Sequence, residues 1–376
     1  MRVAWEATAL LGPRTGVGEF CYHAGVELAK LDGIELSAFA VSWRRRRLLV
    51  DALGARVSVR QLAMPARPLQ TLWSRSDFPP VELFIGRADI VHGTNFVVPP
   101  ARWAKRVVTV HDLTPLLFPE AAHRSTLVFP RLIARAIDRG VLIHTPSEFV
   151  AREVVEHFGA DPSRVFAVHH GIPQLEEARD FTHAELGGFL SRTALGGAPF
   201  ILGLGTIEPR KDFVSLVAAF ALIASEEPDL RLVIAGQKGW GSATLDAAIA
   251  ASPFQDRIQL TGYLSARERN WLLANAAVFA YPSIYEGFGL PPIEAMRFGT
   301  PVVSSDAGSL PEVLGDAAEF FPVGNSQALA KAILLLLHND QLRQSQIERA
   351  SSWIAQFSWT NSARGLTKIY HAALGG

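Results

Sequence analysis

The chain has 376 residues, 36 acidic and 36 basic side chains, and a single cysteine, Cys21. The balanced charge gives no general attraction to nucleic acid, and one cysteine excludes an intramolecular disulfide and a multi-cysteine zinc site. Hydrophobic residues make up 49% of the chain and charged residues 19%, which together with the length is typical of a globular protein with two domains. The sequence shows no signal peptide and no apolar run long enough to span a membrane, so we expect a cytoplasmic protein.

Short apolar segments alternate with helical patterns along the whole chain. In the first half they predict strands at 2–6, 34–42, 56–62, 88–93, 106–112, 141–147 and 164–171. In the second half they predict strands at 199–205, 230–236, 257–262, 276–283 and 300–305, followed by helices near 326–338, 340–356 and 360–373. Strands that are apolar on both faces and separated by helices indicate parallel sheets covered by helices on both sides.

The stretch 173–198 interrupts this alternation, because it has no strand pattern and contains two Gly-Gly pairs. We expect an interdomain connection there, with one short helix. The sequence thus predicts an α/β protein of two Rossmann-like domains that face each other across a deep cleft. The expected parts are a first domain at 1–175, joined by the C-terminal helix at 358–376, a linker at 176–198, and a second domain at 199–357.

The stretch YEGFGLPPIE, residues 285–294, places Glu286 before a glycine-rich bend and Glu294 on what we expect to be the first turn of a helix. Gly289 would let the backbone come close to a ligand, and the N–H groups near Phe288, Gly289 and Leu290 would attract an anion. Glu294 can accept hydrogen bonds from a diol such as a ribose. In a purely structural interpretation Glu294 stabilises the helix dipole and Glu286 is a solvated loop residue.

The stretch LGTIEPRKDF, residues 204–213, places Arg210 and Lys211 between a strand and the helix that follows it. Two adjacent cations at such a turn can hold a diphosphate and stabilise it as it leaves. The alternative is an exposed basic pair at a helix start, which is unfavourable because cations oppose the helix dipole there.

Three further positions lie at expected strand ends. Gly16 and Gly18 follow the first strand, although their spacing does not form the G-x-G-x-x-G pattern of dinucleotide-binding proteins. His111 lies at the end of the strand at 106–112. It is either a structural, hydrogen-bonded histidine or a functional one, and the sequence leaves both interpretations open. Tyr263 follows the strand at 257–262.

The stretch 285–294, with its flanks AYPS and GTPVV, resembles the E-x7-E motif of the retaining, nucleotide-sugar-dependent glycosyltransferases of family 4, which have the GT-B fold. The resemblance covers nearly the whole chain and is strongest at 199–312. It implies that the first domain binds the acceptor and the second the donor, with Glu286 near the sugar and Glu294 on the ribose. It further implies that Arg210 and Lys211 bind the diphosphate.

By the same resemblance, Gly16 and Gly18 would face the donor, His111 would lie near the donor sugar, and backbone groups around Tyr263 would contact the base. One departure is Thr206, which stands where some relatives have a further arginine after the glycine that ends the strand, here Gly205. Charge neutralisation would then rest on Arg210 and Lys211.

The resemblance implies a metal-independent glycosyltransferase that moves a hexose, with retention, from a nucleotide-sugar to a hydroxyl of a glycan or lipid-linked acceptor. No D-x-D stretch stands where a metal-dependent transferase would need one. Mannose is the expected sugar and GDP-mannose the expected donor. The alternatives are a GT-B epimerase or phosphorylase and a non-catalytic nucleotide-sugar-binding protein, whereas the glycine spacing disfavours an oxidoreductase.

Residues 36–110 carry twelve basic and four acidic side chains, a local excess of +8 in a neutral chain. The stretch 43–55 predicts a short helix with Leu48, Leu49, Ala52 and Leu53 on one face, next to a basic cluster of Arg44, Arg45, Arg46 and Arg47. This cluster is either a solvated basic turn or a contact with an anionic membrane surface on the cytoplasmic face of the cell membrane.

Overall fold

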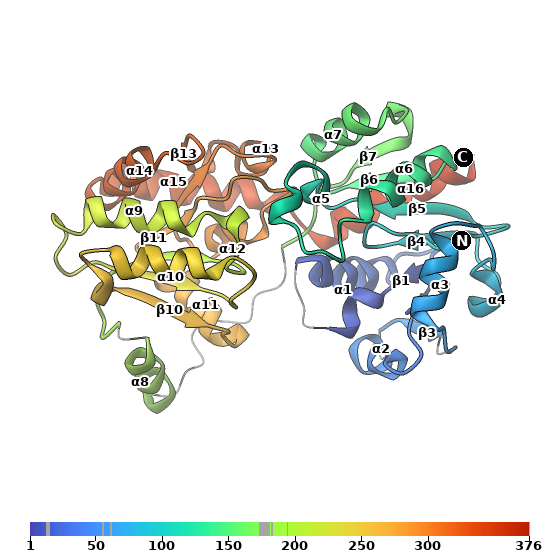
Figure 1. Cartoon of the computed structure of the whole chain (residues 1–376), viewed down its shortest axis with the longest axis horizontal. Helices are drawn as coiled ribbons and strands as arrows, with labels where there is room; N and C mark the ends of the chain where they lie inside the picture. Colours follow the sequence, from blue (N-terminus) through green and yellow to red (C-terminus); the bar gives the residue numbers. More distant parts are fainter. Residues whose placement is uncertain are drawn as a thin grey trace. The chain divides into compact units, whose positions relative to one another are not determined.

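The computed structural model describes residues 1–12, 16–54, 56–60, 62–172, 181, 183–193 and 195–375. The chain divides into two compact units (Figure 1). The first consists of Met1–Pro173 and Phe357–Gly376, and the second of Gln174–Gln356. Within the described residues, no helix combines the length and the apolar character needed to cross a membrane.

The first unit is built on a parallel sheet of seven described strands in the order β3-β2-β1-β4-β5-β6-β7. The strands are β1 (Arg2–Glu6), β2 (Glu35–Phe39), β3 (Ser58–Arg60), β4 (Ile90–Gly93), β5 (Lys105–Thr109), β6 (Leu142–Thr145) and β7 (Val165–Ala167). Strand β1 has the predicted bounds, and each of the others overlaps a predicted segment but is shorter than it. The four residues of β4 and of β6 are all buried, as expected for strands covered on both faces.

Helices cover this sheet on both faces (Figure 1). They are α1 (Gly16–Leu28), α2 (Arg46–Leu53), α3 (Ala66–Trp73), α4 (Glu82–Ile85), α5 (Thr114–Leu117), α6 (Phe129–Asp138), α7 (Glu148–Phe158) and α16 (Trp359–Leu374), with 3-10 turns η1 (Thr8–Leu11), η2 (Pro119–Ala121) and η3 (Pro162–Arg164). Helices α1 and α16 share one apolar core with β1, since Phe20 and Leu28 of α1 and Leu366 and Tyr370 of α16 are buried together with Trp5.

The basic stretch before and within α2 is only partly as predicted. Leu49 and Leu53 are buried, as the expected apolar face requires, but Leu48 is 47% exposed and does not belong to it. The reason is the helix period, since Leu48 lies about 100° around the helix from Leu49. Arg44, Arg45 and Arg47 are exposed, and the side chain of Arg46 lies outside the described part of the structure.

The second unit holds a parallel sheet of six described strands in the order β10-β9-β8-β11-β12-β13. The strands are β8 (Phe200–Leu204), β9 (Arg231–Ala235), β10 (Ile258–Gly262), β11 (Val278–Tyr281), β12 (Val302–Ser305) and β13 (Glu319–Phe321). The edge strand β13 was not predicted. It has only three residues, and Glu319 and Pro322 interrupt the apolar pattern there, whereas the equally short β3 and β7 lie in longer segments with a strand pattern.

The helices of the second unit are α8 (His183–Arg192), α9 (Phe213–Ile223), α10 (Ser242–Ala251), α11 (Ala266–Asn275), α12 (Leu290–Arg297), α13 (Leu310–Leu314), α14 (Ser326–His338) and α15 (Asp340–Trp353). The 3-10 turns are η4 (Pro209–Lys211), η5 (Gln255–Arg257), η6 (Gly315–Ala317) and η7 (Ile354–Gln356). Helix α8 lies where a short helix was expected in the linker, and linker residues 176–180, 182 and 194 lie outside the described residues.

Candidate active site

Lys211 is the centre of a buried charged cluster in the second unit. It is the last residue of η4, which follows β8, and is only 7% exposed. Its Nζ lies 2.5 Å from Oε1 of Glu286 and 2.7 Å from the hydroxyl of Tyr281. The Tyr281 hydroxyl in turn lies 3.0 Å from the same Oε1 of Glu286. Two predicted residues, Lys211 and Glu286, are therefore in direct contact.

Arg210 joins the cluster from the other side of Glu286. Its Nη1 lies 2.8 Å from Oε1 of Glu286 and donates to the carbonyl of Tyr285, also at 2.8 Å. Its Nη2 donates to Oε1 of Glu208 at 2.7 Å. The strand-to-helix turn of Arg210 and the loop after β11 are thus joined by ion pairs and by a main-chain hydrogen bond from Ile284 N to Arg210 O at 2.9 Å.

The cluster keeps its charges despite being buried. Burial by itself would raise the pKa of Glu286, but Arg210 and Lys211 lower it to about 2. Burial lowers the pKa of Lys211, and the neighbouring Glu286 opposes that effect. An ion pair in the interior persists only when it is well hydrogen-bonded, as this one is. The site therefore holds two cations, Arg210 and Lys211, in contact with the carboxylates of Glu286 and Glu208.

A third segment fixes the backbone of Glu286. Its carbonyl accepts hydrogen bonds from the N–H and the hydroxyl of Ser309, both at 3.0 Å. Gly308 has a φ of +58°, and a Cβ there would lie 2.5 Å from the Glu286 carbonyl oxygen. Only glycine permits this close approach. The loop after β12 therefore fixes the main chain of Glu286 through its carbonyl group.

The bend 287–289 leads directly into α12. Gly289 is the N-cap in the left-handed conformation, with φ 95° and ψ 61°, and Leu290 is the first helical residue. Phe288 is buried. Because the helix begins at Leu290, Glu294 is its fifth residue and lies beyond the first turn, so the prediction of a first-turn position is wrong.

Glu294 is nevertheless buried, at 3% exposure, and its Oε2 lies 3.3 Å from Nη1 of Arg269 on α11. The helix dipole acts within the first turn, so it does not account for a carboxylate buried at this position. The structural interpretation of Glu294 as a dipole partner is therefore not supported.

His111 lies in the first unit, two residues after β5. It is buried, and its Nε2 donates to the carbonyl of Thr94 at 2.8 Å. Its ring packs edge-on against Phe20 and Phe96, with centroids 5.4 and 5.6 Å apart. Burial lowers the pKa of His111, so the ring is neutral at pH 7 and its Nδ1 is an acceptor.

Gly16 and Gly18 form the first turn of α1, and residues 13–15 of the predicted glycine loop lie outside the described residues. Tyr263 directly follows β10, two strands from β8 in the sheet, and is 74% exposed. Among the described residues, no group of three or more His, Cys, Asp or Glu side chains is arranged to hold a metal ion.

Two family models together match most of the chain. The model described as Glycosyltransferase Family 4 matches residues 14–174, and the model described as Glycosyl transferases group 1 matches residues 192–353. The O-antigen chain mannosyltransferase B of Escherichia coli is 31% identical over 332 residues, which cover 87% of this chain and 81% of that protein. The chain belongs to the family 4 glycosyltransferases.

Other relatives of this glycosyltransferase include the D-inositol 3-phosphate glycosyltransferase of Nocardia farcinica, 29% identical over 96% of this chain and 86% of that protein. The serotype-specific mannosyltransferase WbdA of Escherichia coli is 28% identical over 72% of this chain, which spans only 34% of that protein.

Among solved structures, HepE of Anabaena in complex with UDP and glucose has a TM-score of 0.74 at 16% identity, covering 99% of this chain and 100% of that one. WaaG, a glycosyltransferase involved in lipopolysaccharide biosynthesis, has a TM-score of 0.72 at 15% identity and covers 100% of both chains. These likenesses confirm the predicted GT-B fold of two Rossmann-like domains.

Several side chains of the glycosyltransferase cluster were not identified from the sequence. Tyr281 and Glu208 contact Lys211 and Arg210, and Arg269 contacts Glu294. Glu208 stands only two residues before Arg210, so the sequence itself indicated that the two side chains could pair. Tyr281 is distant in sequence from Lys211, and Arg269 from Glu294, and only the folded chain brings these pairs together.

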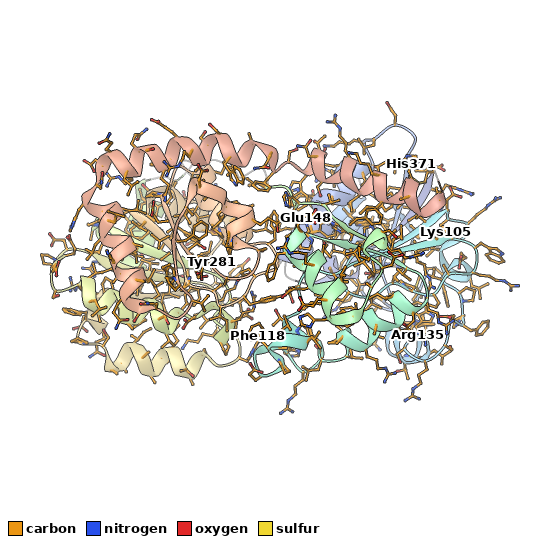
Figure 2. All side chains as sticks on the ribbon, turned by 90° about the horizontal axis from the view of Figure 1, so that it is seen from above. Lys105, Phe118, Arg135, Glu148, Tyr281 and His371 are labelled. Carbon is orange, nitrogen blue, oxygen red and sulfur yellow. The ribbon has the colours of Figure 1, made fainter. Side chains whose placement is uncertain are left out.

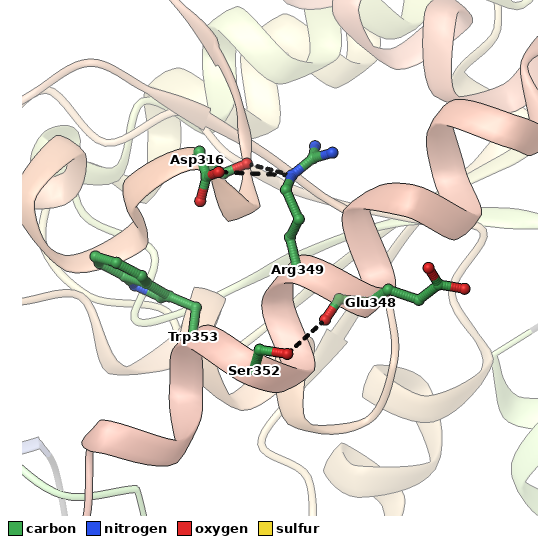
Figure 3. Close-up of a pocket in the computed structure, with 5 residues that line it drawn as sticks. All are labelled: Asp316, Glu348, Arg349, Ser352 and Trp353. Atoms are coloured by element: carbon green, nitrogen blue, oxygen red, sulfur yellow. Dashed lines mark hydrogen bonds and ion pairs between the residues drawn. The ribbon is translucent and has the colours of Figure 1, made fainter.

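The glycosyltransferase also has an open surface pocket of about 500 Å³ between η6 and α15 (Figure 3). It is lined by Asp316, Glu348, Arg349, Ser352 and Trp353. Arg349 Nε donates to the carbonyl of Asp316 at 2.9 Å, and Trp353 Nε1 donates to that of Val313 at 2.8 Å. None of the predicted site residues lines this pocket, so it is not part of the candidate site.

Proposed function

We propose that this glycosyltransferase moves mannose from a nucleotide-sugar, GDP-mannose, to a hydroxyl of a glycan or lipid-linked acceptor, with retention at the anomeric carbon and without a metal ion. The observation that carries the proposal is the buried cluster of Arg210, Lys211 and Glu286. The mannosyl choice is supported by the relatives named as mannosyltransferases. A nucleotide donor is supported by the fold neighbour whose structure contains UDP and glucose.

In this proposal the cations of Lys211 and Arg210 stabilise the negative charge that develops on the departing diphosphate. They supply the positive charge that a metal ion supplies in metal-dependent transferases. Their ion pairs fix them before a donor arrives, so little reorganisation is needed during the reaction. Glu286 would contact the sugar, Glu294 the ribose, and the N–H groups of Phe288, Gly289 and Leu290 the donor phosphates.

Retention needs no carboxylate nucleophile in this scheme. The bond between the anomeric carbon and the diphosphate oxygen breaks, and the acceptor oxygen forms a new bond on the same face of the sugar. The acceptor proton moves to the departing diphosphate. Gly16, Gly18 and His111 of the first unit would face the sugar, and backbone groups near Tyr263 would contact the base.

A panel of nucleotide-sugars tests this function. GDP-mannose is expected to raise the melting temperature more than UDP-glucose or UDP-galactose, because a bound ligand stabilises the folded state. It is also expected to be hydrolysed slowly to GDP and α-mannose without acceptor, with the same rate in EDTA. Binding without hydrolysis would favour a non-catalytic binding protein, and conversion to a different free sugar nucleotide would favour an epimerase.

We further propose that the basic cluster of the first unit attaches the protein to an anionic membrane surface on the cytoplasmic side. Arg44, Arg45 and Arg47 are exposed, and the neighbouring Trp43 is 59% exposed. Near such a surface each arginine contributes about 1 kcal/mol, and an amphipathic tryptophan favours the lipid–water interface.

Co-sedimentation with liposomes tests the attachment. Binding is expected with anionic but not neutral liposomes, is expected to weaken in high salt, and is expected to be lost when Arg44–Arg47 are replaced by serine. The matched control replaces four other arginines of the same unit that are also exposed, namely Arg124, Arg131, Arg152 and Arg164. Equal loss in both variants would indicate only a net-charge effect, and no binding at low salt would favour a soluble acceptor.

A further inference from the structure

Tyr281 is a buried group to which neither the motif nor the scheme above gives a role. It is the last residue of β11, and its side chain is 1% exposed inside the second unit (Figure 2). Its hydroxyl lies 2.7 Å from Nζ of Lys211 and 3.0 Å from Oε1 of Glu286. The hydroxyl therefore touches both members of the central ion pair.

The directions of these hydrogen bonds follow from the chemistry of the groups. An ammonium only donates, so the Tyr281 oxygen accepts from Lys211. An ionised carboxylate only accepts, so the Tyr281 O–H donates to Glu286. Lys211 donates to the same Oε1 at 2.5 Å, which closes a triangle of three hydrogen bonds. The hydroxyl proton has one orientation that satisfies both neighbours.

The triangle restricts the ammonium of Lys211. Two of its three N–H bonds point to fixed acceptors on the sheet and on the loop after β11, so the direction of the third is also fixed. Without the Tyr281 hydroxyl, the Lys211 ammonium would keep only its hydrogen bond to Glu286, and its other N–H groups could change direction. A long lysine side chain loses considerable freedom when it is held in this way, and the tyrosine supplies part of the interaction that holds it.

We propose that Tyr281 is a positioning residue of the transfer reaction, which orients the Lys211 ammonium toward the departing diphosphate by tying it to Glu286. This role rests on the proposed function. It differs from the role of Lys211, because Tyr281 acts on the donor only through the lysine. Its loss should therefore affect the rate of transfer more than the binding of the nucleotide.

The variant Tyr281→Phe isolates the hydroxyl. Phenylalanine keeps the ring, whose centroid lies 4.9 Å from Nζ of Lys211 and 6.0 Å from the ring of Phe279. The matched control is Tyr370→Phe, which removes another buried tyrosine hydroxyl, one that bonds to His92 in the first unit at 2.7 Å. Both variants lose a buried hydrogen bond, so a general loss of stability affects both.

We expect Tyr281→Phe to lower kcat for transfer from GDP-mannose about tenfold, while the donor KM changes less than about threefold. Tyr370→Phe should leave kcat within about twofold of the wild type. In a Lys211→Ala background, adding Tyr281→Phe should change kcat less than about twofold, because the group that it orients is gone.

A kcat of Tyr281→Phe within about twofold of the wild type would overturn the role, and so would a similar loss of kcat in the Lys211→Ala background. An equal kcat loss in Tyr370→Phe would show that stability rather than positioning was measured, and would also overturn it. These outcomes differ from failure of the proposed function, in which the wild-type chain itself neither binds GDP nor releases mannose from GDP-mannose.

Discussion

The charged cluster of the second unit and the buried histidines of the first unit are stabilised in opposite ways. In the second unit, Lys211, Arg210 and Glu286 are charged and paired. In the first unit, the buried His92 and His144 are neutral and hydrogen-bonded. Burial lowers the pKa of His144 to about 3 and those of His92 and His170 well below the ordinary value. The polar cluster of the second unit is therefore charged, whereas the histidine network of the first unit is neutral.

The neutral network of the first unit runs in one direction. Tyr370 donates to Nδ1 of His92 at 2.7 Å, Nε2 of His92 donates to Thr109 at 2.8 Å, and Thr109 donates to Nδ1 of His144 at 2.9 Å. Nε2 of His144 then donates to the carbonyl of Val168 at 3.1 Å. This order follows because the last acceptor is a carbonyl, which cannot donate. The network joins α16 to the sheet across β4, β5 and β6.

The difference indicates what each unit's polar interior is for. Fixed charges are useful where charge develops in a reaction, and they cost little reorganisation when it does. A neutral chain of hydrogen bonds offers no such stabilisation, but it specifies how a helix packs on a sheet. We therefore expect changes in the second unit to affect turnover and changes in the first unit's network to affect stability.

Acidification should give the largest effect, and it should act on the first unit. An unfolded histidine takes up a proton near pH 6.5, whereas the folded-state pKa values of His92, His144 and His170 are depressed, so stability is full above pH 6.5 and falls below it. His144, whose folded-state pKa is about 3, contributes a loss of about 2 kcal/mol between pH 7 and pH 5, and the depressed pKa values of His92 and His170 add to this loss. The loss is a large fraction of the stability of a domain, about 5–15 kcal/mol.

Hydrogen exchange of the full chain at pH 7 and pH 5, corrected for the intrinsic rates, measures this effect by segment. Segments β4, β5 and α16 should lose protection at pH 5. The paired Glu286, whose pKa is depressed to about 2, contributes stability above its ordinary pKa of 4.5 and loses it only below that value. If β8 and β11 lose more protection at pH 5 than β4 and β5 do, the predicted difference in acid sensitivity between the two units is wrong.

Lys211→Ala should give the largest effect on turnover. Removing one donor to a developing anion lowers kcat about 10²–10³-fold, and nucleotide affinity should fall less. Steady-state kinetics with GDP-mannose and calorimetry with GDP measure the two effects. Lys331→Ala, which removes an exposed lysine of α14, is the control and should change neither. Near-normal turnover of Lys211→Ala would show that Lys211 does not stabilise the departing diphosphate.

Glu294→Ala should act on binding. If its carboxylate accepts from the ribose, the loss of a charged hydrogen bond, about 1.5–3 kcal/mol, raises the Kd for GDP about 10- to 150-fold. Calorimetry with GDP measures this, and Glu226→Ala on the exposed surface of the same unit is the control. An unchanged Kd in Glu294→Ala would exclude Glu294 from the nucleotide site.

Tyr370→Phe should have the smallest effect of the four. It removes the first hydrogen bond of the histidine network and leaves Nδ1 of His92 without its donor, which costs about 1–3 kcal/mol of the free energy of unfolding. Urea unfolding at pH 7 measures the loss. If Tyr370→Phe also lowers kcat substantially, the proposed division, in which the first unit's network serves stability and the second unit's cluster serves turnover, is wrong.

Local patterns predicted most of the fold, because buried parallel strands such as β8 and β9 are continuous apolar segments. Strand β13 was missed because it is short and an acidic residue and a proline interrupt its apolar pattern. In the site, Arg210, Lys211 and Glu286 stood out as charges at strand ends. The start of α12 was misplaced because the left-handed conformation of Gly289, which sets it, does not follow from the composition of the bend. Tyr281 is 70 residues from Lys211, and no local pattern predicts such a contact.

Helix α16 closes the core of the first unit, although the entire second unit precedes it in the chain. On the ribosome, the strands of the first unit emerge early, but the helix that covers Trp5 and Phe20 is synthesised last. The second unit is continuous in sequence and can finish folding as soon as it has emerged, while the first must wait with an apolar face open to water or to a chaperone. The first unit therefore begins to be synthesised before the second but can complete its folding only after it.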